Sequence, residues 1–233
     1  MSGDFLGIPG LSFVSVISLL CFIPAIVLHE VAHGFMAHKL GDPTAKSQGR
    51  LSLNPLRHVD PFGTVVLPLL LFIAGGPIFG YAKPVPYNPR YFKNLRKGEL
   101  LTGLAGPAAN LILGLLGVMA AFAFYTVFSV GVRSTAWLDI ALDICYIFTM
   151  INFCLMFFNL LPIPPLDGSS VIAVFLNNKQ LSSYYRLQQY ALPVLMVLMI
   201  AVPYVLHFSP IGIYIDFTAG NLTRFLFDLI FMF

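Results

Sequence analysis

The sequence predicts an all-α polytopic membrane protein, first of all from its composition. Of its 233 residues, 58% are hydrophobic and 10% are charged, whereas an ordinary soluble domain is about 45–50% apolar and about 25% charged. This balance argues against a soluble globular domain, a disordered chain and a nucleic-acid-binding module. The net charge of +3 is also too small to indicate a polyanionic partner. Helices are expected because lipid cannot satisfy the backbone of an open strand.

Uncharged segments long enough to cross a bilayer are the second observation. Residues 11–28 form a run of 18 residues without a charge, and the helical pattern continues to about Lys39. Further apolar segments follow at 62–80, 100–130, about 140–161, 191–206 and 211–233. We expect about five transmembrane helices, plus a re-entrant hairpin and a short β-like membrane-associated segment. They form one domain over 1–233, with its core at 11–170 and a C-terminal helical hairpin at 188–233.

The segment at 62–80 is the one predicted to enter the membrane and return on the same side. Its prolines and glycines weaken a helix, and they are Gly63, Pro68, Gly75, Gly76 and Pro77. Arg224 is left aside because it lies inside the last apolar run. A full crossing would then divide the loop Lys and Arg residues 7 to 5 between the two faces, whereas a re-entrant hairpin divides them 11 to 1. The positive-inside rule favours the hairpin, which places the N-terminus outside and the basic loops in the cytoplasm of a multi-pass cell (inner) membrane protein.

The strongest local pattern is the H-E-x-x-H sequence at residues 29–33. Positions i and i+4 share one face of a helix, so the imidazoles of His29 and His33 can reach one metal ion. Glu30 between them can then activate a metal-bound water as general base. The alternatives are a chance match and a polar cluster at a helix end. We favour one Zn²⁺ per chain on His29 and His33, because an ionisable cluster at membrane depth is costly and therefore indicates a function.

A catalytic zinc site takes a third protein ligand and keeps one position open for water. The best candidate is Asp167, which follows the span at 140–161 after three helix-breaking prolines, Pro162, Pro164 and Pro165. Taken alone, Asp167 would more often be the N-cap of a helix that starts near Gly168. Beside a histidine pair that lacks a third ligand, ligation becomes the better interpretation.

Helix direction supports the same choice of ligand. His29 and His33 lie toward the C-terminal end of their span, and Asp167 follows the end of another. These residues reach one depth only if the two helices run in the same direction, which requires an odd number of crossings between them. The span at 100–130 supplies one crossing, and a re-entrant 62–80 adds none. The hairpin that the charges favour therefore also brings Asp167 to the histidines.

Three ordered motifs make the chain resemble the site-2 proteases, which are intramembrane zinc metalloproteases. They are the H-E-x-x-H pattern at 29–33, Gly-Pro-Ala-Ala-Asn at 106–110, and Asn159-x-x-Pro162 leading to Leu-Asp-Gly at 166–168. The stretches 49–55 and 83–86 look like the compact branch, without a PDZ or nucleotide-sensing domain. The resemblance implies that His29, His33 and Asp167 bind zinc and that Glu30 is the catalytic base. It also implies that Asn110 and Asn159 are polar groups near the site, although the small residues at 106–110 suit helix packing equally well.

The family implies hydrolysis of a peptide bond within or near a transmembrane segment of a membrane protein or peptide. A helical substrate must unwind, and Lys83, Pro84, Val85 and Pro86 read as an extended segment that could pair with it by strand addition. The alternative for this segment is a rigid connector at the interface. Two other functions stay open, a metal-dependent transporter or channel and an inactive scaffold. The expected partners are the substrate and the lipid bilayer, with no nucleic acid, and the sequence does not indicate an oligomeric state.

Overall fold

A computed structural model of the chain describes residues 13–66, 82–129, 136–188 and 190–232. These residues contain helices and no strand, which confirms the all-α prediction for this part of the chain. Three helices are long and apolar enough to cross a membrane: α1 (Phe13–Lys39), α4 (Leu95–Ser129) and α5 (Ala136–Asn159). They correspond to the predicted spans at 11–39, 100–130 and 140–161.

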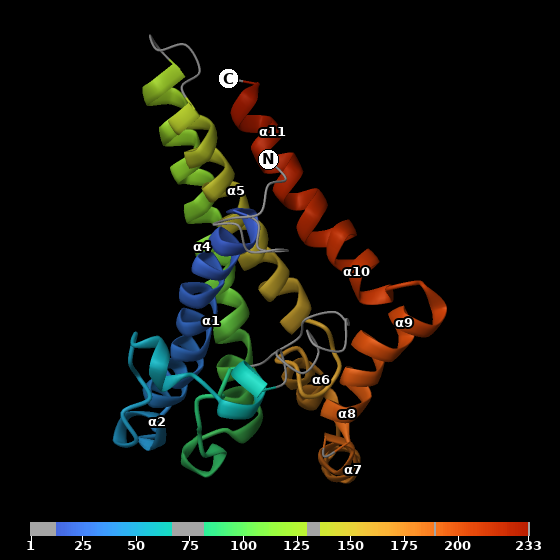
Figure 1. The fold of residues 1–233 in the computed structure, drawn as a ribbon. Coiled ribbons are helices and arrows are strands. Elements are labelled where there is room, and N and C mark those ends of the chain that lie inside the picture. The colour runs from blue at the N-terminus through green and yellow to red at the C-terminus, as the bar shows by residue number, and fades with distance from the viewer. Residues whose placement is uncertain (1–12, 67–81, 130–135, 189, 233) are drawn as a thin grey trace.

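The three long helices pack against one another, with α4 in contact with both α1 and α5. Figure 1 shows that α1 and α5 run in the same direction and that α4 runs in the opposite one. The shared direction of α1 and α5 is the one that the placement of Asp167 beside the histidines requires. Small residues allow close packing, because a Cβ at Gly114 of α4 would lie 2.3 Å from the Phe153 ring of α5.

The C-terminal part is a series of short helical segments rather than two straight spans. It comprises α8 (Ala191–Met196), the π-helical turn Val197–Ala201, α9 (Val202–Leu206), α10 (Pro210–Ile215), the π-helical turn Asp216–Gly220 and α11 (Asn221–Phe231). The two halves, Pro193–Leu206 and Pro210–Phe231, are bent by 104° and form a fourth span only if they count as one. The predicted number of about five spans is therefore not confirmed. The division of the domain, including the helical hairpin at 188–233, stays a prediction.

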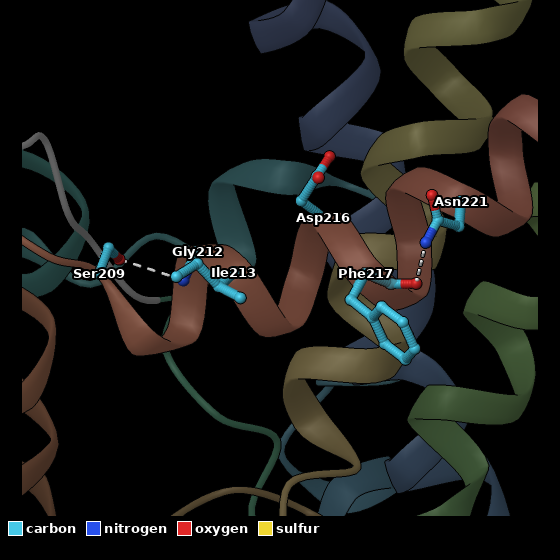
Figure 2. Close-up of a pocket in the computed structure, with 6 residues that line it drawn as sticks. All are labelled: Ser209, Gly212, Ile213, Asp216, Phe217 and Asn221. Atoms are coloured by element: carbon cyan, nitrogen blue, oxygen red, sulfur yellow. Dashed lines mark hydrogen bonds between the residues drawn. The ribbon is translucent and has the colours of Figure 1, made fainter.

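Apolar side chains attach α11 to the three-helix core. Phe227 and Ile230 pack with Ala121 of α4 and Cys145 of α5, and Ala219 packs with Phe153 and Met156 of α5. Figure 2 shows a pocket near this contact, lined by Ser209, Gly212, Ile213, Asp216, Phe217 and Asn221. Asp216, in the π-helical turn before α11, pairs with Arg224 of α11 at 3.1 Å, so this part of the chain carries its own counter-ion where lipid would offer none.

Short elements close the end of the bundle at which α1 finishes and α4 begins (Figure 1). They are α2 (Thr44–Ser47), the 3-10 turns Pro55–Arg57 and Pro89–Tyr91, the π-helical turn Pro61–Val66, α6 (Ser169–Phe175) and α7 (Asn178–Gln188). Buried Asp42 links two of these parts, since it accepts hydrogen bonds from the backbone N–H groups of Thr44 at 2.9 Å and Asn88 at 2.6 Å. Burial of Asp42 opposes ionisation, but these bonds outweigh it and lower the pKa of the carboxyl below its ordinary value.

Two predictions concern residues outside the described part of the chain. Most of the predicted re-entrant hairpin, residues 67–80, and the N-terminal 12 residues are among them. The hairpin and the orientation across the membrane therefore stay predictions. Residues 82–88, which we call the 82–88 segment, form neither helix nor strand, so the β-like assignment is not confirmed.

Candidate metal centre

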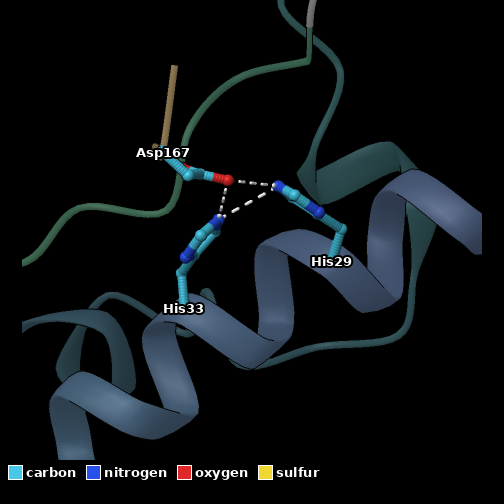
Figure 3. A group of neighbouring side chains, drawn as sticks. All are labelled: His29, His33 and Asp167. Carbon is cyan, nitrogen blue, oxygen red and sulfur yellow. Dashed lines mark hydrogen bonds and ion pairs between the residues drawn. The ribbon is translucent and has the colours of Figure 1, made fainter. Parts of the chain in front are cut away.

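The three predicted metal ligands meet at one point. His29 and His33 project from the same face of α1, and Asp167 reaches them from the loop between α5 and α6 (Figure 3). The two Nε2 atoms are 3.0 Å apart, and Asp167 Oδ2 lies 3.1 Å from His29 Nε2 and 3.3 Å from His33 Nε2. Tetrahedral zinc with bonds of about 2.0–2.1 Å to nitrogen places its ligand atoms about 3.3 Å apart. The triangle therefore has nearly the dimensions of one face of a zinc coordination shell.

The hydrogen atoms of the imidazoles point away from this triangle. His33 Nδ1 lies 2.7 Å from the Thr102 carbonyl oxygen, which can only accept, so Nδ1 carries the proton and the neutral ring presents a lone pair at Nε2. Asp167 Oδ2 is buried and has no hydrogen-bond partner. Three electron pairs thus face one another and require a cation between them. A proton can bridge one pair at a time, whereas a divalent ion satisfies all three.

A polar network fixes the orientation of His29 in the same way. His29 Nδ1 donates to Asn110 Oδ1 at 2.5 Å, and Asn110 Nδ2 donates to Asn152 Oδ1 at 3.0 Å. Asn152 Nδ2 in turn donates to the Phe148 carbonyl at 2.9 Å. Because a backbone carbonyl can only accept, this last bond fixes which group donates in every bond of the network. Asn110 and Asn152 are fully buried. Such second-layer bonds orient a ligating histidine and raise its basicity.

The absence of a side chain at Gly106 of α4 leaves the space that the two imidazoles occupy. A Cβ at this position would lie 2.4 Å from His33 Nε2 and 2.6 Å from His29 Nε2, and real side chains do not approach so closely. The Gly-Pro-Ala-Ala-Asn motif thus serves packing and the site together, through Gly106 for the first and Asn110 for the second.

The loop that carries Asp167 is closed by its own backbone. The Gly168 N–H donates to the Asn159 carbonyl at 2.6 Å, and the Asn159 side chain donates to the Leu155 carbonyl of its own helix at 2.9 Å. The hydrogen bonds of Asn159 therefore join it to its own helix and to the loop, and not to the histidines. The Asp167 side chain does not cap α6, since this helix, which starts at Ser169, has no side-chain capping bond.

The candidate base Glu30 lies beside the 82–88 segment. Its Oε2 accepts a hydrogen bond from the Val85 N–H at 2.9 Å. Lys83, Pro84, Val85 and Pro86 therefore pass next to the site, as the sequence suggested. Their role in binding substrate is not tested by these contacts.

The sequence is similar to that of a known protein family. The model of peptidase family M50 matches residues 17–202. The chain belongs to peptidase family M50. This family comprises the site-2 proteases, so the resemblance seen in the motifs is confirmed. No solved structure matches the chain significantly.

Named relatives of this M50 protein are zinc metalloproteases. "Putative zinc metalloprotease YwhC" of Bacillus subtilis is 37% identical over 207 residues, which are 88% of this chain and 86% of the relative. "Putative zinc metalloprotease Rip2" of Mycolicibacterium smegmatis is 30% identical over 231 residues, covering 92% and 83%. "Zinc metalloprotease MJ0392" of Methanocaldococcus jannaschii is 25% identical over 168 residues, covering 72% and 36%. The M50 protein is therefore a zinc metalloprotease.

We expect Asn110→Ala to weaken zinc binding by about 10- to 100-fold, the usual cost of losing a second-layer partner of a ligating histidine. The substitution removes the acceptor of the His29 Nδ1–H bond, so the ring can rotate or change tautomer. The affinity is measured by competition with a chelator. Asn159→Ala is the matched control, because its amide bonds only its own helix, and an equal loss in that variant would contradict the role given to Asn110.

Proposed function

We propose that this M50 protein hydrolyses peptide bonds within or near transmembrane segments of membrane proteins. The observation that carries the proposal is a ligand triangle whose two histidines lie on α1, a helix that is long and apolar enough to cross a membrane. His33 and His29 are six and ten residues from the last residue of α1, or about 9 and 15 Å at 1.5 Å per residue. Those distances support a site within the apolar layer rather than on a soluble surface.

The residues of this site suit hydrolysis by an activated water. His29, His33 and Asp167 would hold one zinc ion per chain and leave a position open. When bound, zinc supplies Lewis-acid polarisation of the peptide carbonyl and lowers the pKa of a coordinated water. Glu30 accepts a proton from the attacking water and returns it to the leaving amine, so the carboxylate is unchanged after one cycle. Asn110 and the Thr102 carbonyl hold the imidazoles in the required tautomer.

The substrate is expected to pass along the 82–88 segment, which lies against Glu30. Strand addition at Lys83, Pro84, Val85 and Pro86 would meet a constraint. The Lys83 N–H already bonds the His58 carbonyl at 2.8 Å, and the Val85 N–H bonds Glu30. The prolines between and after them carry no N–H. A substrate strand would therefore have to replace one of these partners.

The remaining parts of the proposal concern place and partners. The enzyme acts in a cell membrane as a multi-pass protein, with the N-terminus outside and the basic loops and the opening of the site cytoplasmic. The partners are a transmembrane protein or peptide and the bilayer, and no nucleic acid. The presence of all three ligands and the base favours an active enzyme over a scaffold.

Mapping of cleavage sites tests this function. Membranes that contain the native chain are compared with membranes that contain Glu30→Gln, and new peptide termini are identified by mass spectrometry. We expect termini that depend on Glu30 and that fall within or next to apolar segments of about 20 residues. Termini confined to soluble loops would overturn the intramembrane assignment while leaving the protease assignment intact.

A further inference from the structure

Glu30 has one defined anchor, and it is a backbone group. The Val85 N–H donates to Oε2 at 2.9 Å, and Oε1 has no hydrogen-bond partner among the described residues. A glutamate side chain on a helix has several rotamers, and ordering it costs free energy. The bond from Val85 selects the rotamer in which one oxygen is held and the other is available to take a proton.

The packing around Gly34 brings the 82–88 segment close enough to make this bond. Gly34 lies one helical turn after Glu30 on α1 and faces the same neighbour. A Cβ at residue 34 would lie 2.6 Å from Val85 Cγ1 and 2.7 Å from Leu51 Cδ2. Val85 itself is 5% exposed. Any larger residue at position 34 would push the segment, and with it the Val85 N–H, away from α1.

Arg50 holds the same segment from a second direction. This arginine is buried, and its guanidinium donates to the Lys83 carbonyl at 2.7 Å, to the Pro84 carbonyl at 3.2 Å and to the Arg57 carbonyl. Three backbone acceptors on one planar group fix both position and angle, because the guanidinium presents its donors in a rigid fork. Two of the three acceptors are in the residues directly before Val85.

We infer that the Val85 N–H is a positioning group for the catalytic Glu30 carboxylate, and that Arg50 and Gly34 place the 82–88 segment so that this bond forms. The inference rests on the proposed function, in which Glu30 is the base. The segment then serves the proton transfer, whereas strand addition would use the same N–H to bind a substrate carbonyl. The two roles differ in which kinetic constant depends on that N–H.

A pair of substitutions at residue 85 separates the N–H from the side chain. Val85→Ala keeps the N–H and removes the packing on Gly34, whereas Val85→Pro removes both. We expect kcat of Val85→Pro to be about tenfold lower than that of Val85→Ala, since a hydrogen bond to a charged group contributes about 1.5–3 kcal/mol. KM and zinc content stay equal in the two variants. Val85→Ala is itself the matched control, since it keeps the N–H that donates to Glu30.

Other outcomes contradict the inference. Equal kcat in Val85→Ala and Val85→Pro means that Glu30 does not need the N–H, and a raised KM with unchanged kcat means that the N–H binds substrate. If Val85→Pro loses zinc or fails to fold, replacement of the Val85 amide by the corresponding ester removes the N–H alone and is judged by the same criteria. Activity that survives Glu30→Gln would instead overturn the proposed base, so the two failures are distinct.

A double-mutant cycle tests the part given to Arg50. Arg50→Gln cannot bridge the Lys83 and Pro84 carbonyls, so we expect it to lower kcat in a chain that has the Val85 N–H. In Val85→Pro the same substitution is expected to change kcat by less than about twofold, because residues that act as one unit are not additive. Full additivity of the two losses would show that Arg50 acts on kcat independently of the Val85 N–H, which contradicts the part given to it here.

Discussion

Glu30→Gln is expected to lower kcat/KM by about 10²- to 10⁴-fold, which is the contribution of a positioned general base. The substitution replaces a carboxylate, which can accept a proton from water, by an amide of the same shape, which cannot. The amide oxygen can still accept the Val85 N–H bond that Glu30 accepts at 2.9 Å. His29, His33 and Asp167 are unchanged, so zinc content is expected to equal that of the native chain. The loss then reports proton transfer rather than positioning or metal binding.

The chain offers a matched control for this experiment, since Glu30 and Glu99 are its two glutamates. Glu99→Gln makes the same chemical change on α4, outside the ligand triangle, and is expected to leave kcat/KM within about twofold. The assay is cleavage of a transmembrane peptide by the purified proteins at equal zinc content. Native activity in Glu30→Gln would contradict the base assignment, and equal losses in both glutamate variants would point to a general effect of lost charge.

The sequence predicted the long helices because their signal is local and strong. α1, α4 and α5 are each long and apolar enough to cross a bilayer, and this signal can be found in the sequence without any tertiary contact. The C-terminal part was harder to predict, because it lacks one long straight helix with such a signal. The bend of 104° lies between Leu206 and Pro210, where His207 adopts a left-handed backbone conformation, and apolar composition alone does not encode it.

In the candidate site too, the features set by the local sequence could be predicted, and those set by tertiary packing could not. His29, Glu30 and His33 have a fixed spacing on one helix, and the direction of α1 and α5 was enough to bring Asp167 to them. Asn152 was missed, although an amide inside an apolar span is a signal that could have found it. The Thr102 carbonyl that orients His33 could not have been found, since every residue has a carbonyl and only the packing of α4 on α1 selects this one.

The same limit applies to the contacts around Glu30. Arg50 reads in the sequence as one basic loop residue among several, and the charge count treats it as a marker of the cytoplasmic face. In the structure it is buried and bonded to backbone carbonyls 33 and 34 residues away. Burial of a charged guanidinium costs free energy. The backbone carbonyls that accept from its two terminal nitrogens offset part of that cost, whereas its buried Nε–H has no hydrogen-bond partner among the described residues.

Asp167→Asn is expected to separate the metal from the fold. The amide is a neutral and weaker ligand, so we expect zinc affinity to fall by at least 10- to 100-fold, the cost of losing even a second-layer partner. In the metal-free protein the effect is reversed. An amide N–H₂ can donate to the His29 and His33 Nε2 atoms, which lie 3.1 and 3.3 Å from Asp167 Oδ2, and so replaces a cluster of acceptors by hydrogen bonds.

Thermal unfolding with and without zinc measures both effects. A ligand that binds only the folded state stabilises it by about 2.7 kcal/mol at a concentration of 100 Kd, so the native chain should show a rise in Tm with zinc that Asp167→Asn lacks. Without zinc, the Tm of Asp167→Asn should equal or exceed that of the native chain. Asp228→Asn makes the same exchange on the exposed face of α11 and should keep the native response to zinc. A native zinc response in Asp167→Asn would remove Asp167 from the ligand set, because the triangle would then bind the ion through its two histidines alone.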